Sequence, residues 1–281
     1  MKIRELARRH PVGAYFCLAF FISWAGSLLT AGPLFLQGDL MEPQDLWTTG
    51  ALMLAGPFLA GLTMTYLING RPGLQDLFSR MVRWRVGGRW YAALLIFPTL
   101  ILAVSLTLSA WAYPELSPTF FAPGILMGLF AGLVEEIGWM GFAFPAMRSK
   151  RSILGATICL GVLHALWHVV ADFLGQYQAF GGYWWLYFAA FSLFVVALRV
   201  LIVWVYENTG SLLLAQLMHA SSSGFLAILI PMGIAAVNWV AFYSVYAIVL
   251  STAALIVGAK YMRSGQLGFD RWWDSHQFSR N

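Results

Sequence analysis

Long apolar blocks, separated by short polar connections, make up almost the whole chain. Eight of these blocks are about 20 residues long, which is the length that an α-helix needs to cross the hydrocarbon core of a bilayer. They run over Ala14–Leu34, Gly50–Ile68, Trp90–Trp111, Ala122–Phe144, Ile153–Phe173, Trp184–Tyr206, Leu212–Ile230 and Trp239–Lys260. The pattern predicts an all-α, polytopic membrane protein of about eight transmembrane helices, with residues 1–281 forming a single membrane domain.

The positions of the basic residues indicate how these helices are oriented. Every Lys and Arg except Arg199 lies before block one, between blocks two and three, between blocks four and five, or at and after the end of block eight. Because basic residues are enriched in cytoplasmic connections, both termini are predicted to be cytoplasmic. Arg199, toward the cytoplasmic end of block six, is expected to snorkel to the interface. The opposite connections have acidic residues as their only charges: Asp39, Glu42, Asp45, Glu115 and Asp172.

Composition argues against a soluble protein and against a nucleic-acid-binding one. Hydrophobic residues make up 60% of the 281 residues and charged residues only 10%, whereas soluble domains carry about 25% charged residues. The net charge of +5 resides in the connections that set the topology, so the expected partner is membrane lipid and not nucleic acid. We expect a multi-pass protein of a bacterial or archaeal plasma membrane.

Two further expectations concern single features. Cys17 and Cys159 each lie inside an apolar block, so we expect small core residues and neither a disulfide nor a thiolate site. The Arg-rich connection 71–89 carries apolar residues at helical spacing and is expected to lie on the cytoplasmic surface as an amphipathic helix.

Two adjacent carboxylates, Glu135 and Glu136, lie inside block four, which otherwise carries no charge. A charged residue at this depth costs about 2.5–3.5 kcal/mol on insertion scales, so such residues usually serve a function. Gly128 and Gly132 form a GxxxG pair that lets a neighbouring helix approach closely, and Glu135 shares their face. Glu136 is turned about 100° away. One carboxylate is therefore expected to point into a site while the other supports it.

Block five carries His164 and His168, which share one helical face at i and i+4, and Asp172 extends the same row. Two histidines at this spacing can bind one metal ion, or one can catalyse while the other orients it. A lone histidine in an apolar helix is more often a packing residue. Two histidines on one face, one helix after a carboxylate pair, favour a site.

Block seven carries the third polar set, a stripe formed by Gln216, His219 and Ser223 on an otherwise apolar helix. Imidazole, hydroxyl and amide groups can all donate hydrogen bonds to a developing oxyanion. Together the three blocks supply a general base, imidazoles for a water or a metal ion, and hydrogen-bond donors. This inventory suits attack of water on a carbonyl group.

At these residues the chain resembles the CAAX protease and bacteriocin-processing (CPBP) family of intramembrane endopeptidases, which are relatives of the type II CAAX prenyl proteases. The family pattern is EExxxR on one transmembrane helix, FxxxH on a later one and HxxxN, or a variant of it, on a third. Glu135 and Glu136 match the first motif, His168 the second and His219 the third. The resemblance covers about Gly124–Gly224, within a motif-bearing core over about 122–230.

Three positions depart from the family pattern. Met140 stands where the family has Arg, so a carboxylate–guanidinium pair from that position is absent. His164 occupies the aromatic position of the second motif, and Ser223 replaces Asn in the third. Serine still donates a hydrogen bond, so the loss of the Arg is the more serious change.

The resemblance implies hydrolysis of a peptide bond in a membrane-associated or lipidated peptide or protein. By that analogy Glu135 activates water with the help of Glu136, and His168 holds the water or a divalent metal. His219 and Ser223 stabilise the oxyanion, while His164 and Gln216 support the site. The metal, if one is used, is a divalent ion such as Zn²⁺ bound through Glu135, His168 and His219.

Two other classes of function stay open at this point. One is a non-catalytic membrane scaffold or immunity protein on the same fold, which the missing motif Arg at Met140 motivates. The other is a proton- or ion-coupled transporter, which buried carboxylates and histidines also suit. Against a transporter stands the restriction of these polar residues to blocks four, five and seven.

Overall fold

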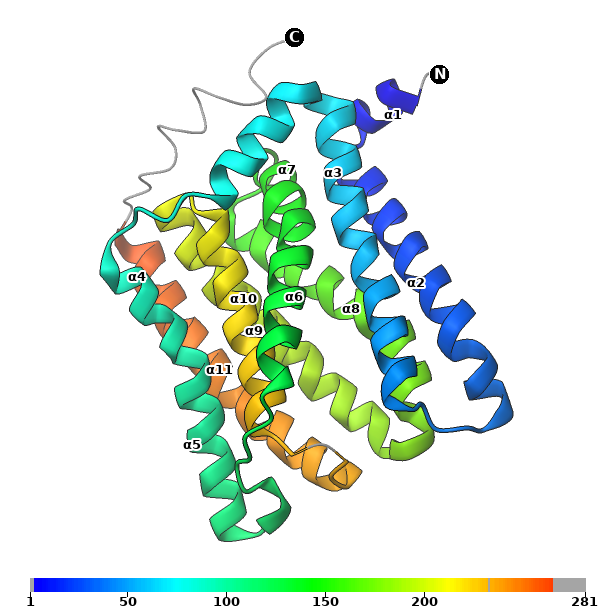
Figure 1. The fold of residues 1–281 in the computed structure, drawn as a ribbon. Coiled ribbons are helices and arrows are strands. Elements are labelled where there is room, and N and C mark those ends of the chain that lie inside the picture. The colour runs from blue at the N-terminus through cyan, green and yellow to red at the C-terminus, as the bar shows by residue number, and fades with distance from the viewer. Residues whose placement is uncertain (1–2, 232, 265–281) are drawn as a thin grey trace.

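The computed structural model describes residues 3–231 and 233–264 (Figure 1). Within these residues it contains eight helices long and apolar enough to cross a membrane, which confirms the predicted all-α polytopic architecture. The helical elements are α1 (Ile3–Arg9), α2 (Pro11–Gln37), α3 (Pro43–Met81), α4 (Gly88–Ala92), η1 (Ala93–Leu95), α5 (Ile96–Trp111), η2 (Pro114–Leu116), α6 (Pro123–Gly138), η3 (Trp139–Ala143), α7 (Phe144–Arg148), α8 (Ile153–Phe180), α9 (Tyr183–Thr209), α10 (Leu212–Leu229) and α11 (Ala236–Ser264).

The orientation of the helices in the membrane stays a prediction, since the structure contains no bilayer. Of the basic residues that support this prediction, Lys2, Arg271 and Arg280 lie outside the described residues.

Several helices are longer than the apolar blocks that predicted them. The clearest case is α8, which continues from the predicted end at Phe173 to Phe180, so that Asp172, which had been counted with the acidic connections, lies well inside the helix. The carboxylate of Asp172 accepts hydrogen bonds from Trp184 Nε1 at 2.9 Å and from the Tyr187 hydroxyl at 3.1 Å. The cost of a carboxylate in the helix is offset by these two donors on α9, a pairing that helix periodicity does not reveal.

The Arg-rich connection 71–89 is not one continuous helix: it is helical up to Met81, and α4 begins at Gly88. The chain bends at Gly70, whose positive φ of 65° suits glycine, and continues as a helix to Met81. This last part of α3 packs onto the bundle through Leu77, which is fully buried. Arg80, at its end, donates hydrogen bonds to the Tyr206 hydroxyl at 2.6 Å and to the carbonyl oxygen of Gly141 at 3.1 Å.

The helix α6 runs through the middle of the bundle, with α2 and α3 on one side and α10, α5 and α11 on the other (Figure 1). Its most extensive neighbour is α10. A Cβ atom added at Gly128 or Gly132 would overlap the α10 backbone at Gly224 or Gln216, so only glycine allows this approach. This result confirms the predicted role of the GxxxG pair and identifies α10 as the neighbouring helix.

A second close approach joins α6 to α3 just after the carboxylate pair. An added Cβ atom at Gly61 of α3 would lie 2.8 Å from the Cα atom of Gly138. Close glycine contacts therefore lie on both sides of the two acidic residues along α6. Those before them join α6 to α10, and the one after them joins α6 to α3. The helix α8 is joined to α2 by a hydrogen bond from Trp167 Nε1 to Ser23 Oγ at 2.7 Å.

Two single-residue expectations are wrong. Arg199 does not snorkel, because its side chain is completely buried and is paired with Glu136. The buried carboxylate attracts the guanidinium inward more strongly than the interface does. Cys17 is exposed on the outer surface of α2 and is therefore not a core residue, whereas Cys159 is half-buried; both are free thiols.

The contact between α6 and α10 predicts the effect of a single methyl group. Gly128→Ala should lower the free energy of unfolding by about 1–3 kcal/mol, because the backbone of Gly224 has no room to yield. Thermal unfolding of the purified protein in detergent measures this change. Gly13→Ala in α2 is the matched control, because an added Cβ there meets nothing within 4 Å. Equal melting temperatures for the two variants would contradict the assigned packing.

Candidate active site

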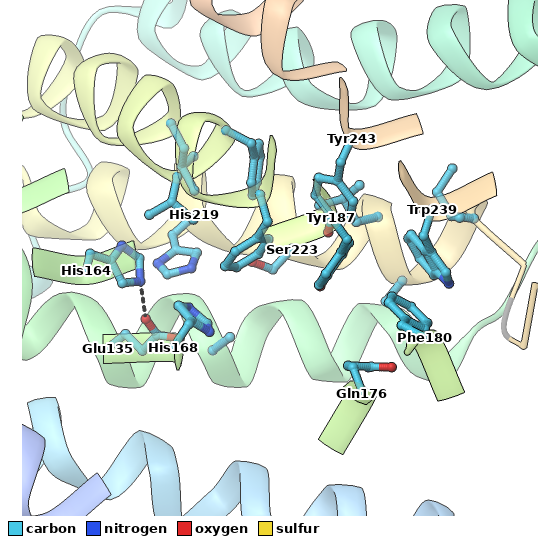
Figure 2. Close-up of a pocket in the computed structure, with 18 residues that line it drawn as sticks. Glu135, His164, His168, Gln176, Phe180, Tyr187, His219, Ser223, Trp239 and Tyr243 are labelled. Carbon is cyan, nitrogen blue, oxygen red and sulfur yellow. Dashed lines mark hydrogen bonds and ion pairs between the residues drawn. The ribbon is translucent and has the colours of Figure 1, made fainter. Parts of the chain in front are cut away.

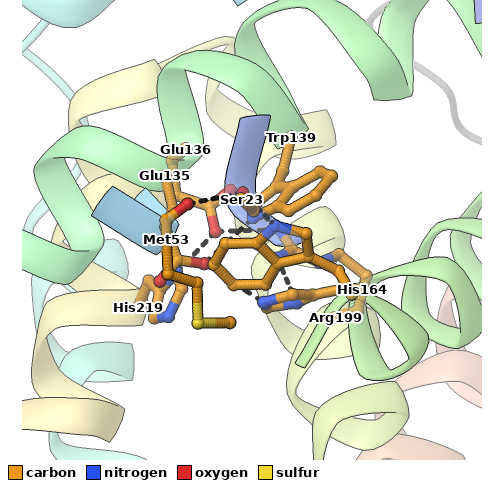
Figure 3. A network of polar contacts seen from close by, with 9 residues as sticks. Ser23, Met53, Glu135, Glu136, Trp139, His164, Arg199 and His219 are labelled. Carbon is orange, nitrogen blue, oxygen red and sulfur yellow. Dashed lines mark hydrogen bonds and ion pairs between the residues drawn. The ribbon is translucent and has the colours of Figure 1, made fainter. Parts of the chain in front are cut away.

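Glu135 lies at the centre of the site, and one of its two carboxylate oxygens is held firmly (Figure 3). Its Oε2 atom accepts a hydrogen bond from Trp139 Nε1, one helical turn later, at 3.0 Å. The same oxygen lies 3.1 Å from Nε2 of His164 on α8. Among the described residues no hydrogen bond reaches Oε1, so this oxygen stays available to a ligand. The carboxylate is thus oriented through one atom and chemically free at the other.

Glu136 points to another side of α6 and is paired with a buried guanidinium (Figure 3). Arg199 of α9 donates from its first terminal nitrogen to Oε1 at 2.9 Å and to Oε2 at 2.7 Å. Nδ1 of His219, on α10, lies 2.7 Å from Oε1 of the same carboxylate. Both Glu136 and Arg199 are 0% exposed. A buried charge is tolerated only when it is paired and hydrogen-bonded. Arg199 supplies the positive partner of Glu136, and Glu136 supplies the negative partner of Arg199.

The second terminal nitrogen of Arg199 lies 2.9 Å from Nδ1 of His164, and this contact fixes the tautomer of the imidazole. A guanidinium only donates, so Nδ1 of His164 must accept and its proton lies on Nε2. His164 therefore donates from Nε2 to Glu135. In the same way the Glu136 carboxylate accepts the Nδ1 proton of His219, which leaves Nε2 of a neutral His219 with a lone pair. Arg199 thus sets the tautomer of His164 on α8, and Glu136 sets that of His219 on α10.

The described residues enclose a cavity of about 350 Å³ beside these groups (Figure 2). Its polar end is formed by five of the predicted site residues: Glu135, His164, His168, His219 and Ser223. The remaining wall is mostly apolar or aromatic and comes mainly from α8, α9, α10 and α11: Ala131, Gln176, Phe180, Tyr187, Phe191, Phe194, Val195, Leu198, Leu226, Ala227, Ile230, Trp239 and Tyr243. The three motif-bearing helices therefore contribute to one cavity.

Two predicted site residues do not line this cavity. Glu136 lies behind Glu135 and acts on the site through His219 and Arg199. Gln216 donates from Nε2 to the carbonyl oxygen of Leu133 at 2.7 Å, so it joins α10 to α6. Asp172, which extends the histidine row on α8, is likewise absent from the cavity wall.

Sequence reasoning missed Arg199 and Trp139 as members of the site. A signal for Arg199 was present, since it is the only Lys or Arg in the interior of a predicted span, whereas Lys260 only ends one. No linear motif connects it to Glu136, from which it is 63 residues distant. Trp139 follows Glu135 at i+4 and could have been found from helical spacing.

A short π-helical segment, η3, covers Trp139–Ala143 and is separated from the carboxylate pair only by Ile137 and Gly138. Such segments are rare inside α-helices and are frequent at functional sites, because they widen one turn and redirect side chains. Here the widened turn is completely buried. The Trp139 ring also packs against the imidazole of His164, with ring centroids 5.1 Å apart. The ring therefore supports both partners of the Glu135–His164 contact.

Aromatic rings hold His168 in place. Its imidazole centroid lies 4.7 Å from the Trp167 ring and 5.0 Å from the Phe191 ring, both in edge-to-face geometry. The His164 ring lies on a third side at 5.3 Å. Among the described residues no hydrogen bond reaches His168, so its ring nitrogens are available to a ligand in the cavity.

The donor atoms that could hold a metal ion differ from the predicted set. Ligand atoms of Glu135, His164 and His168 lie within 4.8 Å of one another, whereas His219 does not join this group. A carboxylate and two imidazoles suit Zn²⁺. However, Nε2 of His164 carries a proton as long as Arg199 donates to Nδ1, and a protonated nitrogen has no lone pair for a metal. The residues in this hydrogen-bonding arrangement therefore do not fit a three-ligand metal site.

Comparison with known proteins concerns the same part of the chain. Residues 116–225 match the family described as type II CAAX prenyl endopeptidase Rce1-like. A curated relative, CAAX prenyl protease 2 of Methanococcus maripaludis, is 33% identical over 105 residues. This alignment covers 36% of the present chain and 38% of the relative's length.

The matched residues include the parts of α6, α8 and α10 that carry the three motifs. They also include both carboxylates of the pair and Arg199, while the cavity walls formed by α11 lie beyond them. The predicted resemblance is confirmed over this stretch: residues 116–225 of the chain match the type II CAAX prenyl endopeptidase Rce1-like family.

Proposed function

We propose that this protein is an intramembrane endopeptidase in which Glu135 activates a water molecule for attack on a peptide bond of a membrane-associated or lipidated substrate. The observation that carries the proposal is the state of the Glu135 carboxylate. Its Oε2 atom is oriented by Trp139 and His164, while its Oε1 atom is free of hydrogen bonds among the described residues. A general base needs this combination of a fixed position and an available lone pair.

In the proposed reaction, Oε1 of Glu135 takes a proton from water as the water oxygen attacks the carbonyl carbon. The resulting tetrahedral oxyanion accepts a hydrogen bond from the Ser223 hydroxyl, and from Nε2 of His219 when that imidazole carries a second proton. His168 orients the water through a ring nitrogen. Collapse of the oxyanion breaks the carbon–nitrogen bond, and Glu135 returns the proton to the leaving amine. Atoms and charges balance without a metal ion or another cofactor.

Arg199 weakens the case for a non-catalytic scaffold. That alternative depends on Met140, which stands where the family motif has arginine. In this chain a guanidinium nevertheless pairs with Glu136, and it comes from α9. The carboxylate pair therefore keeps a positive partner, and the main reason to expect an inactive site is removed.

The role of Glu135 predicts a large loss of activity in an isosteric variant. Glu135→Gln should reduce kcat for cleavage of a prenylated CAAX-type peptide in proteoliposomes by about 10²–10⁴-fold, because an amide does not accept the proton. Asp172→Asn, a carboxylate of the same bundle outside the cavity wall, should keep most of the activity. Full cleavage by Glu135→Gln would remove the proposal. Ion flux through these proteoliposomes without peptide cleavage would favour the transporter instead.

The Arg199–Glu136 pair predicts non-additive effects on stability. Arg199→Met alone should lower the free energy of unfolding by about 3–5 kcal/mol, because it leaves a buried carboxylate without its partner. The double variant Arg199→Met with Glu136→Gln should regain much of this loss, since neither charge then remains. Unfolding in detergent of the wild type, both single variants and the double variant measures the coupling. Strictly additive losses would show that the two side chains do not depend on each other.

The tautomer of His164 predicts that activity does not require a bound metal. Peptide cleavage should persist after dialysis against EDTA and 1,10-phenanthroline, and elemental analysis of the active protein should find less than one Zn²⁺ per chain. Added Zn²⁺ should not raise the activity of the dialysed protein. Loss of cleavage on chelation, with recovery on addition of Zn²⁺, would show that His164 exchanges its bond with Arg199 for a bond with the metal.

A further inference from the structure

One backbone carbonyl group of η3 lacks its usual helical donor. In an α-helix the carbonyl oxygen of Gly141 would accept a hydrogen bond from the N–H of the residue four positions later, but that residue is Pro145, which has no N–H. Gly141 is buried, so bulk water does not take the place of this donor. Because a buried carbonyl group without a partner is costly, a donor from another element stabilises this turn.

Arg80, near the end of α3, supplies such a donor. Its Nη2 atom donates to the Gly141 carbonyl oxygen at 3.1 Å. The other two nitrogens are held as well, since Nη1 donates to the Tyr206 hydroxyl at 2.6 Å and Nε donates to Oδ2 of Asp76 at 2.9 Å. The residue is buried, with an exposed fraction of 4%. Because a guanidinium is planar and rigid, two fixed nitrogens aim the third one at the carbonyl oxygen.

Arg80 belongs to a segment that crosses the end of the bundle (Figure 1). We refer to residues 71–83 as the strap. After Arg80, the carbonyl oxygen of Arg83 accepts a hydrogen bond at 2.6 Å from Oγ of Ser211, the residue that caps the N-terminus of α10. Before Arg80, the fully buried Leu77 packs beside η3. The backbone that presents the guanidinium is therefore fixed on both sides of the residue.

The turn that Arg80 holds is also the turn that carries Trp139. Gly141 follows Trp139 by two residues, and both lie in the same π-helical turn. This turn contains a hydrogen bond from the N–H of Phe144 to the carbonyl oxygen of Trp139. The Trp139 ring donates to Oε2 of Glu135 at 3.0 Å. A shift of the turn would therefore move the ring and reorient the carboxylate, and small displacements of a reacting group slow a reaction strongly.

We infer that Arg80 is a positioning residue for Glu135. Its guanidinium fixes η3 through the Gly141 carbonyl group, and η3 holds the Trp139 ring that orients the carboxylate. The consequence for catalysis rests on the proposed function, whereas the consequence for the structure of η3 does not. The strap lies before residues 116–225, so this support comes from outside the stretch that matches a known family.

Three variants test this role through steady-state cleavage of a prenylated CAAX-type peptide in proteoliposomes. Arg80→Met removes all three donors, and it should lower kcat about 10–100-fold while KM changes by less than about twofold, because only the orientation of the base is lost. Arg80→Lys keeps a cation that can donate to the Gly141 carbonyl oxygen, so its kcat should recover to within about fivefold of the wild type. Tyr206→Phe is the matched control: it removes another hydrogen bond of the same guanidinium, and kcat should stay within about threefold.

Hydrogen exchange followed by mass spectrometry reports on η3 without any assay of catalysis. In Arg80→Met the amides of residues 139–147 should exchange at least about fivefold faster than in the wild type, because the turn opens more often. The helix α5 is the reference, and its exchange should be unchanged. Arg80→Lys and Tyr206→Phe should resemble the wild type in both segments.

Unchanged kcat in folded Arg80→Met would overturn the inference. So would an equal rise of exchange in residues 139–147 and in α5, because Arg80 would then only stabilise the bundle as a whole. An equal loss of kcat in Tyr206→Phe would overturn it as well, since the contact with α9 would carry the effect.

If Arg80→Met does not fold, Asp76→Ala decides, because it releases one nitrogen of the guanidinium at a partly exposed position. It should lower kcat about threefold and speed exchange in residues 139–147. Unchanged values of both would overturn the inference.

The two readouts separate this inference from the proposed function. Faster exchange of residues 139–147 in Arg80→Met, together with full cleavage by Glu135→Gln, would support the link between Arg80 and η3 and remove the endopeptidase proposal. Loss of cleavage in Glu135→Gln together with unchanged kcat in Arg80→Met would leave the endopeptidase proposal in place and remove this inference.

Discussion

The pairing of Glu136 with Arg199 is the interaction on which the rest of this site depends. Inside an apolar helix bundle a single charge is solvated neither by water nor by polar side chains, so a carboxylate there needs a positive partner. Here that partner comes from α9 and is as completely buried as the carboxylate itself. The pair holds α6 and α9 together at the depth of the site, where apolar packing alone would allow the helices to slide.

From this pair a single chain of hydrogen bonds leads to Glu135. The guanidinium fixes the His164 tautomer, and His164 together with Trp139 holds one oxygen of Glu135. The glycine contacts on either side of the carboxylates keep α6 at the required distance from α10 and α3. The two acidic residues are neighbours in the chain and belong to the same helix, yet their surroundings give them different roles. Glu136 neutralises the buried charge of Arg199. Glu135 keeps one carboxylate oxygen without a hydrogen bond among the described residues.

Much of this arrangement could be predicted from the sequence, because the membrane limits the choices. Apolar blocks of spanning length identified the eight helices, and the rarity of polar residues inside them pointed to Glu135, His168, His219 and Ser223. The predictions were wrong where a side chain had two physically reasonable destinations. Arg199 had the interface and a buried carboxylate within reach, and only the packing of α9 against α8 and α10 decides between them. The donors that satisfy the Asp172 carboxylate inside α8 likewise come from another helix, α9.

The walls of the cavity come from two parts of the chain with different relationships to known proteins. The polar end lies within residues 116–225, which match a known family, whereas Trp239 and Tyr243 of α11 lie after that stretch. Aromatic exchanges in α11 therefore change the shape of the chamber without touching the hydrogen bonds around Glu135. Under the proposed function, a change in this terminal helix would alter which molecules fit the chamber and leave the polar groups at its other end in place.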